Sequence, residues 1–323
     1  SSLERFPSAR RPLAATMGAS QTKPGTAVQA ALYGPAPFFC YPWKPLLNEL
    51  YGGGYAKSYL HFRTQHMDGS NLFLHCLCMV WQLSSNYALL QQLDRACAPI
   101  AALVGFRDAE EGGRVVTRST TALWILHLLR TSPTPVVVKI ASAFSVALAH
   151  TFFGAWFDAH WRKVVFVQGF IEAVAVQRLI LMKQRSLGAA SVAYFVARCA
   201  LWKYISANRG LLKDKLAAVN GALVALIAAC ASSKKPLERS VAMGFYGWII
   251  ALLTDNKATY FWSAGMIATL AQGIAHRISG EAATLEVLQG DDMDHTSYEL
   301  SHVTFFPNLL FQACYANLKA AWQ

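Results

Sequence analysis

The sequence predicts an all-α protein, a polytopic integral membrane bundle of about eight transmembrane helices. Of its 323 residues, 54% are hydrophobic and only 15% are charged, whereas a soluble domain usually carries about a quarter charged residues. The apolar residues also gather in runs: 216–232, 241–254 and 260–275 contain no charged side chain, and 136–157 contains one Lys and one His. Runs of about 17–25 apolar residues can span a bilayer, because a helix satisfies its own backbone hydrogen bonds.

Nine segments have the composition of membrane helices: 71–91, 119–131, 136–157, 163–182, 189–206, 214–232, 239–254, 258–276 and 300–318. The second is short enough to be re-entrant, so we expect eight spans, with seven to nine allowed. Trp, Tyr, Lys and Arg at the ends of the shorter runs would complete them at interfacial depth. Most connections are short, which predicts that successive helices lie antiparallel and adjacent.

The chain divides into two parts. Residues 1–37 are polar and rich in Ser, Ala, Arg and Pro, which predicts a disordered or extended arm whose composition resembles the tail of an organelle transit peptide. Residues 38–323 form one helical membrane domain, with a helix breaker at the glycines 52–54. We expect no soluble second domain.

The chain is basic, with a formal net charge of +11. Its Lys and Arg residues cluster at the ends of the predicted helices, for example at 162–163, 183–185 and 234–235. Anchoring of helices in anionic headgroups requires this placement. The expected partners are therefore membrane lipids, and not nucleic acid.

His66, Asn71 and His75 surround the predicted start of the first membrane helix. Asn71 and His75 are four residues apart and share one helix face. Gly69 and Ser70 favour a turn with Ser70 as the N-cap of the helix. Such a turn would let His66 fold back over the N-terminal end of the helix toward His75.

A second histidine group lies near the end of the chain. His276 ends a predicted helix, and His295, Glu299 and His302 are spaced to share one helical face. Glu299 and His302 have the Glu-x-x-His spacing by which helical bundles hold iron or manganese. Imidazole and carboxylate are ligands that suit non-haem Fe(II). The ordinary alternative, in which these histidines make hydrogen bonds between helices or lie at the interface, stays open at this point.

The spacing His66-x4-Asn71-x3-His75 resembles the opening signature of the 2-hydroxy-fatty-acid dioxygenase (Mpo-like) family of small membrane proteins, with Tyr59-Leu-His-Phe62 as its aromatic lead-in. Ala275-His276, followed by Glu281-Ala-Ala-Thr284, is similar to the second family signature, a Gly-His pair and then Glu and Pro-Ala-Thr. The motifs lie in 59–91 and 258–318. This chain departs from the family in its length and in the helices inserted between the motifs.

The resemblance implies an Fe(II)-dependent dioxygenase of the endoplasmic reticulum membrane that shortens a 2-hydroxy fatty acid, or a related lipid, by one carbon. It assigns Fe(II) to His66, His75 and His276, and His302 is a candidate fourth ligand. Asn71 would orient a ligand or a bound water, and Glu299 would hydrogen-bond to the metal site or join it. The apolar tail of the substrate would lie between helices.

The competing interpretation is a non-catalytic structural subunit of a large photosynthetic or respiratory membrane complex that keeps the family scaffold. The extra helices, the many aromatic residues and the transit-like arm favour it, and the arm would direct the chain to a mitochondrion or plastid. The sequence leaves open whether the chain is an enzyme. Stoichiometric iron would favour the enzyme, whereas co-purifying membrane-protein subunits without iron would favour the subunit.

The segment between the last two predicted helices is acidic. It contains six carboxylates and one Arg, which predicts either a lid over the metal site or a docking surface for a basic partner. As a lid, it would bring Glu281 or Glu299 near His276, and His302 would close the ring. The carboxylates are Glu281, Glu286, Asp291, Asp292, Asp294 and Glu299.

Overall fold

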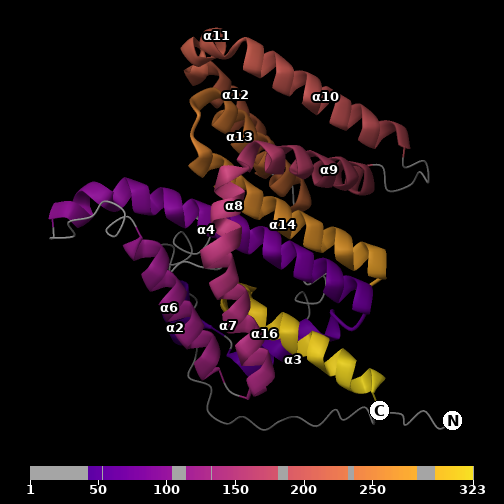
Figure 1. The fold of residues 1–323 in the computed structure, drawn as a ribbon. Helices are drawn as coiled ribbons and strands as arrows, with labels where there is room; N and C mark the ends of the chain where they lie inside the picture. Colours follow the sequence, from indigo (N-terminus) through magenta and orange to yellow (C-terminus); the bar gives the residue numbers. More distant parts are fainter. Residues whose placement is uncertain are drawn as a thin grey trace.

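The structure, a computed structural model, describes residues 43–52, 54–103, 114–131, 133–180, 188–231, 236–281 and 295–322. Across these ranges the chain forms fourteen helices and no strand, so the predicted all-α class is confirmed. The predicted arm, 1–37, lies outside the described residues. The helices (Figure 1) are α2 Trp43–Tyr51, α3 Tyr55–Thr64, α4 Gly69–Leu103, α6 Val115–Arg130, α7 Val136–Leu148, the π-helix η1 Ala149–Phe153, α8 Gly154–Ala159, α9 Trp161–Ile180, α10 Gly188–Ala207, α11 Arg209–Asp214, α12 Leu216–Ala231, α13 Pro236–Thr254, α14 Lys257–Ser279 and α16 His295–Ala321.

The predicted bundle of eight membrane spans is wrong. In the part of the chain that the structure describes, one helix is long and apolar enough to cross a membrane, the continuous run Val136–Ala159 made of α7, η1 and α8. The other predicted segments are helical where the structure describes them, but the helices are too short or too polar. Helix α4 illustrates the reason, because it has no charge between 71 and 91 yet buries Gln82, Ser85 and Asn86.

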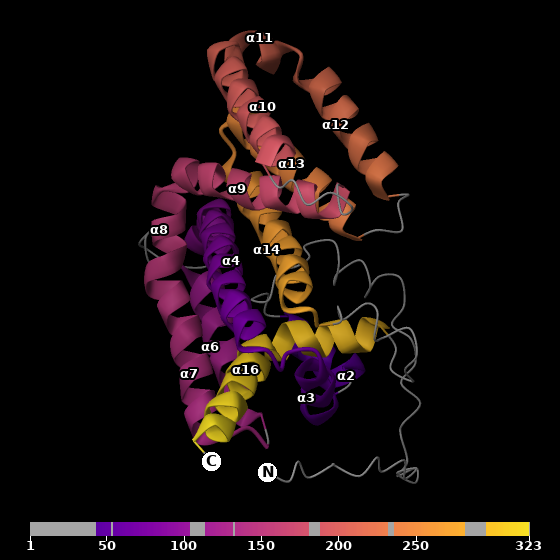
Figure 2. The ribbon, with the colours of Figure 1, turned by 90° about the vertical axis from the view of Figure 1, so that its right-hand side faces the viewer.

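Helices α4 and α14 form the centre of the molecule and run side by side in opposite directions (Figures 1 and 2). Near the middle of the pair, the indole Nε1 of Trp81 donates to the carbonyl oxygen of Ala264 at 3.1 Å. His75 and His276 lie at one end of the pair. Arg95 and Lys257 lie at the other end, about 30 Å away along the helices at a rise of 1.5 Å per residue.

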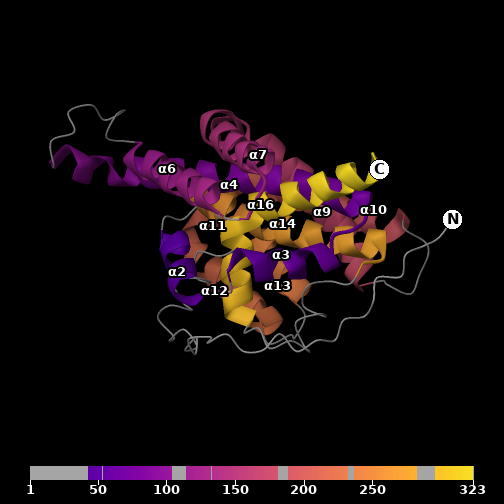
Figure 3. The same ribbon diagram turned by 90° about the horizontal axis from the view of Figure 1, so that it is seen from below.

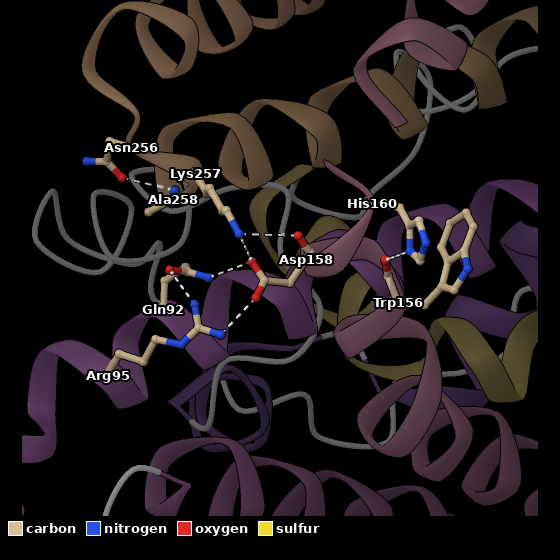
Figure 4. A network of polar contacts seen from close by, with 8 residues as sticks. All are labelled: Gln92, Arg95, Trp156, Asp158, His160, Asn256, Lys257 and Ala258. Atoms are coloured by element: carbon tan, nitrogen blue, oxygen red, sulfur yellow. Dashed lines mark hydrogen bonds and ion pairs between the residues drawn. The ribbon is translucent and has the colours of Figure 1, made fainter. Parts of the chain in front are cut away.

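Asp158 fixes the far end of this pair (Figure 4). This residue, at the end of α8, is 8% exposed. Its carboxylate accepts hydrogen bonds from Gln92 at 3.0 Å and Arg95 at 2.8 Å, both on α4, and from Lys257 of α14 at 3.2 Å. Asn256 caps α14 beside it by accepting from the backbone N–H of Ala258 at 3.0 Å. One carboxylate therefore joins α4, α8 and α14.

Two groups of helices surround the central pair. Helix α16 contacts α2, α3, α4 and α7, and Figure 3 shows α3 and α16 together on one side of the molecule. Helix α9 and helices α10 to α13 gather at the opposite end, where α13 and α9 contact α14 (Figure 2). Buried aromatic side chains fill both regions: Phe62, Trp124 and Phe306 in the first, and Trp248 and Tyr260 in the second.

The glycines 52–54 separate two helices, as the sequence predicts. Helix α2 ends at Tyr51 and α3 begins at Tyr55. Gly54 has a φ of +79°, a left-handed conformation that glycine adopts without steric cost. This break places α3 so that its last residues lead directly to His66.

Replacing Asp158 with Asn should lower the free energy of unfolding by about 1–3 kcal/mol, because Lys257 and Arg95 lose the negative charge beside them and the amide has only one acceptor oxygen. The matched control is Asp255→Asn, since Asp255 pairs with Arg209 at 3.2 Å but its side chain is 61% exposed. Exposed ion pairs contribute less than about 1 kcal/mol. Denaturant unfolding of both variants checks the prediction, and equal effects would contradict the role given to Asp158.

Candidate metal centre

A short turn between α3 and α4 positions the first histidine. Helix α3 ends at Thr64, and the chain turns through residues 65–68 before α4 begins at Gly69. The carboxylate of Asp68 accepts from the backbone N–H of Ser70 at 2.8 Å and of Asn71 at 3.0 Å. The predicted turn is present, but the predicted cap is wrong, because Asp68 and not Ser70 satisfies the first N–H groups of the helix.

His66 folds back onto His75, and their Nε2 atoms lie 3.1 Å apart. Nδ1 of His66 lies 2.7 Å from the carbonyl oxygen of Phe62, and Nδ1 of His75 lies 2.9 Å from that of Asn71. A carbonyl accepts only, so each Nδ1 carries the single hydrogen of a neutral imidazole. The two Nε2 lone pairs therefore face each other.

His276, in the last turn of α14, completes a group of three. One ring nitrogen from each histidine lies within 4.8 Å of the other two. The His276 ring centroid is 4.6 Å from that of His66 and 5.0 Å from that of His75, with the rings nearly perpendicular. The predicted convergence of these three residues is confirmed.

The three histidines are buried from solvent, with exposed fractions of 1%, 2% and 4% for His66, His75 and His276. Burial lowers the pKa of His75 to about 3, and the charge of His276 acts in the same direction. Burial, followed by the neighbouring His75 and His276, lowers the pKa of His66 as well. A proton between the facing lone pairs is thus disfavoured. The buried group can instead hold a metal ion.

Asn71 is fully buried beside the histidines. Its side-chain Nδ2 donates to the carbonyl oxygen of Gln65 at 3.1 Å and to Glu281 at 2.6 Å, which uses both hydrogens of the amide. The 3.4 Å approach of Nδ2 to Nδ1 of His276 is then a packing contact. The Oδ1 atom of Asn71 is buried without a hydrogen-bond partner among the described residues. Asn71 therefore supports the site through both its backbone and its side chain.

Glu281 closes the turn over the histidines. One carboxylate oxygen accepts from the backbone N–H groups of Met67 at 2.6 Å and Asp68 at 3.0 Å, and the other accepts from Asn71. The expectation that Glu281 or Glu299 lies near His276 is thus confirmed for Glu281. Residues 282–294, which hold most of the predicted acidic segment, lie outside the described residues.

His302 and Glu299, the other predicted site residues, are both in α16. His302 is not a member of the three-histidine group. Its ring contacts Phe62, with centroids 5.6 Å apart, and Phe62 stacks on His66 at 3.7 Å. Burial lowers the pKa of His302 to about 4. The Glu299 side chain lies outside the described part of the structure.

Sequence reasoning missed two supporting residues. Gln65 is 1% exposed, and its carbonyl oxygen accepts from Asn71. Asp68 caps α4 and supplies an N–H to Glu281. Asp68 comes two residues before Ser70, the first polar residue of the helix. An Asp in this position is a signal for capping, so the sequence could have identified Asp68. Nothing in the local sequence marks Gln65 as buried.

An apolar cavity of about 310 Å³ lies between α4, α7, η1 and α16. On α4 it is lined by Cys76, the residue after His75, and by Met79 and Leu83, and none of the three histidines lines it. Phe144 of α7 and Phe311 of α16 contribute aromatic walls. Met79 is one turn beyond His75 on the same helix face, so the cavity extends away from the histidine end of α4.

In comparisons of sequence and structure, no family model, no curated protein and no solved structure matches the chain. The site itself and the motif residues that form it are therefore the only indications of function that the described part of the chain offers.

Replacing Glu281 with Gln should loosen the turn, because an amide cannot accept from Met67, Asp68 and Asn71 together. Hydrogen exchange at the amides of residues 67 and 68 should become about tenfold faster or more, as expected for the loss of a charged acceptor. The control is Asp214→Asn, which changes an exposed carboxylate on α11. Unchanged exchange at 67 and 68 would show that Glu281 does not hold the turn.

Proposed function

We propose that His66, His75 and His276 bind Fe(II), and that the chain is a membrane-associated dioxygenase-like enzyme acting on 2-hydroxy fatty acids or related lipids. The observation that carries the proposal is the 3.1 Å separation of two Nε2 atoms whose Nδ1 atoms both face carbonyl oxygens. Two lone pairs held at this distance in a dry site repel each other, and a cation between them removes the repulsion. The third imidazole lies where it can bind the same cation.

The donor set suits a transition metal. Neutral imidazole is a ligand for iron, zinc, copper and nickel, and three protein ligands leave other coordination positions open. Fe(II), when bound, would supply the binding and activation of O2. The protein would orient the imidazoles through the carbonyl groups of Phe62 and Asn71, which fix the tautomers, and would exclude water through burial.

The apolar cavity supports an elongated hydrophobic substrate. Its walls are almost entirely apolar, and the residue after His75 is among them. A polar head at the metal and an apolar tail along Met79 and Leu83 would match this arrangement. The likeness of His66-x4-Asn71-x3-His75 to the Mpo-like signature supports a 2-hydroxy carboxylate as that head.

The proposed membrane contact is the helix Val136–Ala159. Only 22% of its most apolar window is buried. Large apolar side chains line its outer surface, including Val136, Ile140, Phe144 and Phe152, each at least 54% exposed. Lipid tails would cover this surface, and the substrate would reach the cavity wall at Phe144 from the same side. The endoplasmic reticulum is the membrane that the family resemblance favours.

The same exposed surface also supports the second candidate function, a structural subunit of a membrane complex. Helix α9 adds Phe166 and Phe170, which are 43% and 51% exposed. Partner helices would bury these side chains as effectively as lipid would. This candidate does not account for the facing imidazole lone pairs, so we place it second.

The protein purified with iron should contain about one Fe per chain, and His75→Ala should lose most of it because one of three ligands is removed. His160→Ala is the matched control, since His160 is half-buried, lies outside the three-histidine group and has a ring that bonds to the carbonyl oxygen of Trp156. Elemental analysis after gel filtration measures the iron. If the protein is free of iron and co-purifies with other membrane subunits, the result would contradict the enzyme and favour the structural subunit.

A second experiment tests the substrate. The iron-loaded protein should consume one O2 per 2-hydroxy fatty acid and yield an acid one carbon shorter together with CO2 and water, and it should not act on the unhydroxylated acid. Ala141→Phe, which fills the cavity from α7, should lower kcat/KM for long chains more than for short ones. Equal loss for all chain lengths would remove the cavity from the proposal, and no turnover of any hydroxy acid would remove the substrate class.

A further inference from the structure

A second buried polar cluster lies among α9, α10, α13 and α14, and it shares no residue with the histidine group. Its centre is an ion pair between Glu172 of α9 and Arg198 of α10, with Nε and Oε2 2.7 Å apart. The two side chains are 0% and 2% exposed. A buried ion pair is costly unless hydrogen bonds satisfy the remaining donors and acceptors.

Glu172 is well satisfied. Besides Arg198, it accepts from Nε2 of Gln168 at 2.6 Å and from the hydroxyl of Tyr194 at 3.0 Å. The carboxylate can only accept, so the Gln168 amide must present its nitrogen to Glu172. The Oε1 atom of Gln168 therefore points away from Glu172 and needs a hydrogen-bond donor of its own.

The backbone leaves room for the charged pair. A Cβ atom at Gly169 would lie 2.8 Å from Nη1 of Arg198, and one at Gly244 would lie 3.3 Å from Oε1 of Glu172. Two glycines on different helices thus allow the close approach of the guanidinium and the carboxylate. Side chains at either position would press against the cluster.

Four polar atoms around this pair are buried without a hydrogen-bond partner within the described part of the chain: Nη2 of Arg198, Oε1 of Gln168, Nε1 of Trp248 and the hydroxyl of Tyr260. All four residues are at most 3% exposed. The guanidinium carbon of Arg198 lies 4.5 Å from the Trp248 ring centroid. Burial raises the pKa of Tyr260, and the charges of Arg198 and Glu172 act on its hydroxyl.

We propose that this cluster binds an uncharged hydroxyl oxygen, either water or the hydroxyl group of a small organic molecule. The charges of Glu172 and Arg198 cancel, so the cluster is already neutral. An added cation would be repelled by Arg198, and an added anion would be repelled by Glu172. The four atoms offer two donors, one acceptor and one hydroxyl that can do either. A water that accepts from Arg198 and Trp248 can donate to Gln168 and to the Tyr260 hydroxyl, whereas an organic hydroxyl group, which has one hydrogen, can bond to three of the four atoms; buried waters typically make about three such bonds.

The replacement Tyr260→Phe tests the proposal through the sign of the change in Tm. If the Tyr260 hydroxyl bonds to a resident oxygen, the variant should unfold about 2 °C lower or more. If the hydroxyl has no partner, its removal should leave Tm unchanged or raise it, and the proposal is overturned. The matched control is Tyr204→Phe, because Tyr204 of α10 is 55% exposed and its hydroxyl is free to meet solvent.

An experimental density map of the full chain provides the second measurement. It should show an oxygen within about 2.7–3.2 Å of at least three of the four atoms. Side chains that turn to bond one another, with no such oxygen, would contradict the proposal even if Tyr260→Phe destabilises. Solvent extraction and mass spectrometry then separate the sources: a stoichiometric hydroxyl compound that Tyr260→Phe loses identifies an organic ligand, and its absence identifies water.

Discussion

The antiparallel contact between α4 and α14 holds the two ends of the histidine group together. His75 and His276 are far apart in the sequence and meet only because these helices keep one register. A slip of one helical turn would move a side chain by about 5.4 Å, more than twice the length of a metal–nitrogen bond. Asp158 fixes the register at one end, the Trp81 indole bonds across the middle, and Glu281 joins the turn to α14 at the other end.

The histidine centre is organised by backbone acceptors in a dry environment. The carbonyl groups of Phe62 and Asn71 set the tautomers of His66 and His75, and burial keeps both rings neutral. The nitrogen atoms that could bind a metal ion are thus held in place in its absence, which would reduce the cost of ordering them on binding. Glu281 accepts hydrogen bonds from the turn that follows His66 and from Asn71, so its negative charge stays next to the three histidines.

Much of the helical pattern was predictable, because each long apolar run coincides with a helix. The number of membrane spans was not predictable, because an apolar run does not tell whether it faces lipid or another helix. Helix α4, for example, buries the polar side chains of Gln82 and Asn86. His66 and His75 could be paired from local spacing. His276 needed the resemblance, since no periodicity relates it to α4. Helical spacing linked His302 to the site, but its ring contacts Phe62, which stacks on His66, and it is not a member of the three-histidine group.

The most direct test of the metal centre is X-ray absorption at the iron edge of the full chain loaded with Fe(II). We expect three imidazole nitrogens at about 2.0–2.2 Å from the metal, and one fewer in His276→Ala. A shell of oxygen atoms without the scattering of imidazole rings, or a spectrum that His276→Ala leaves unchanged, would contradict it.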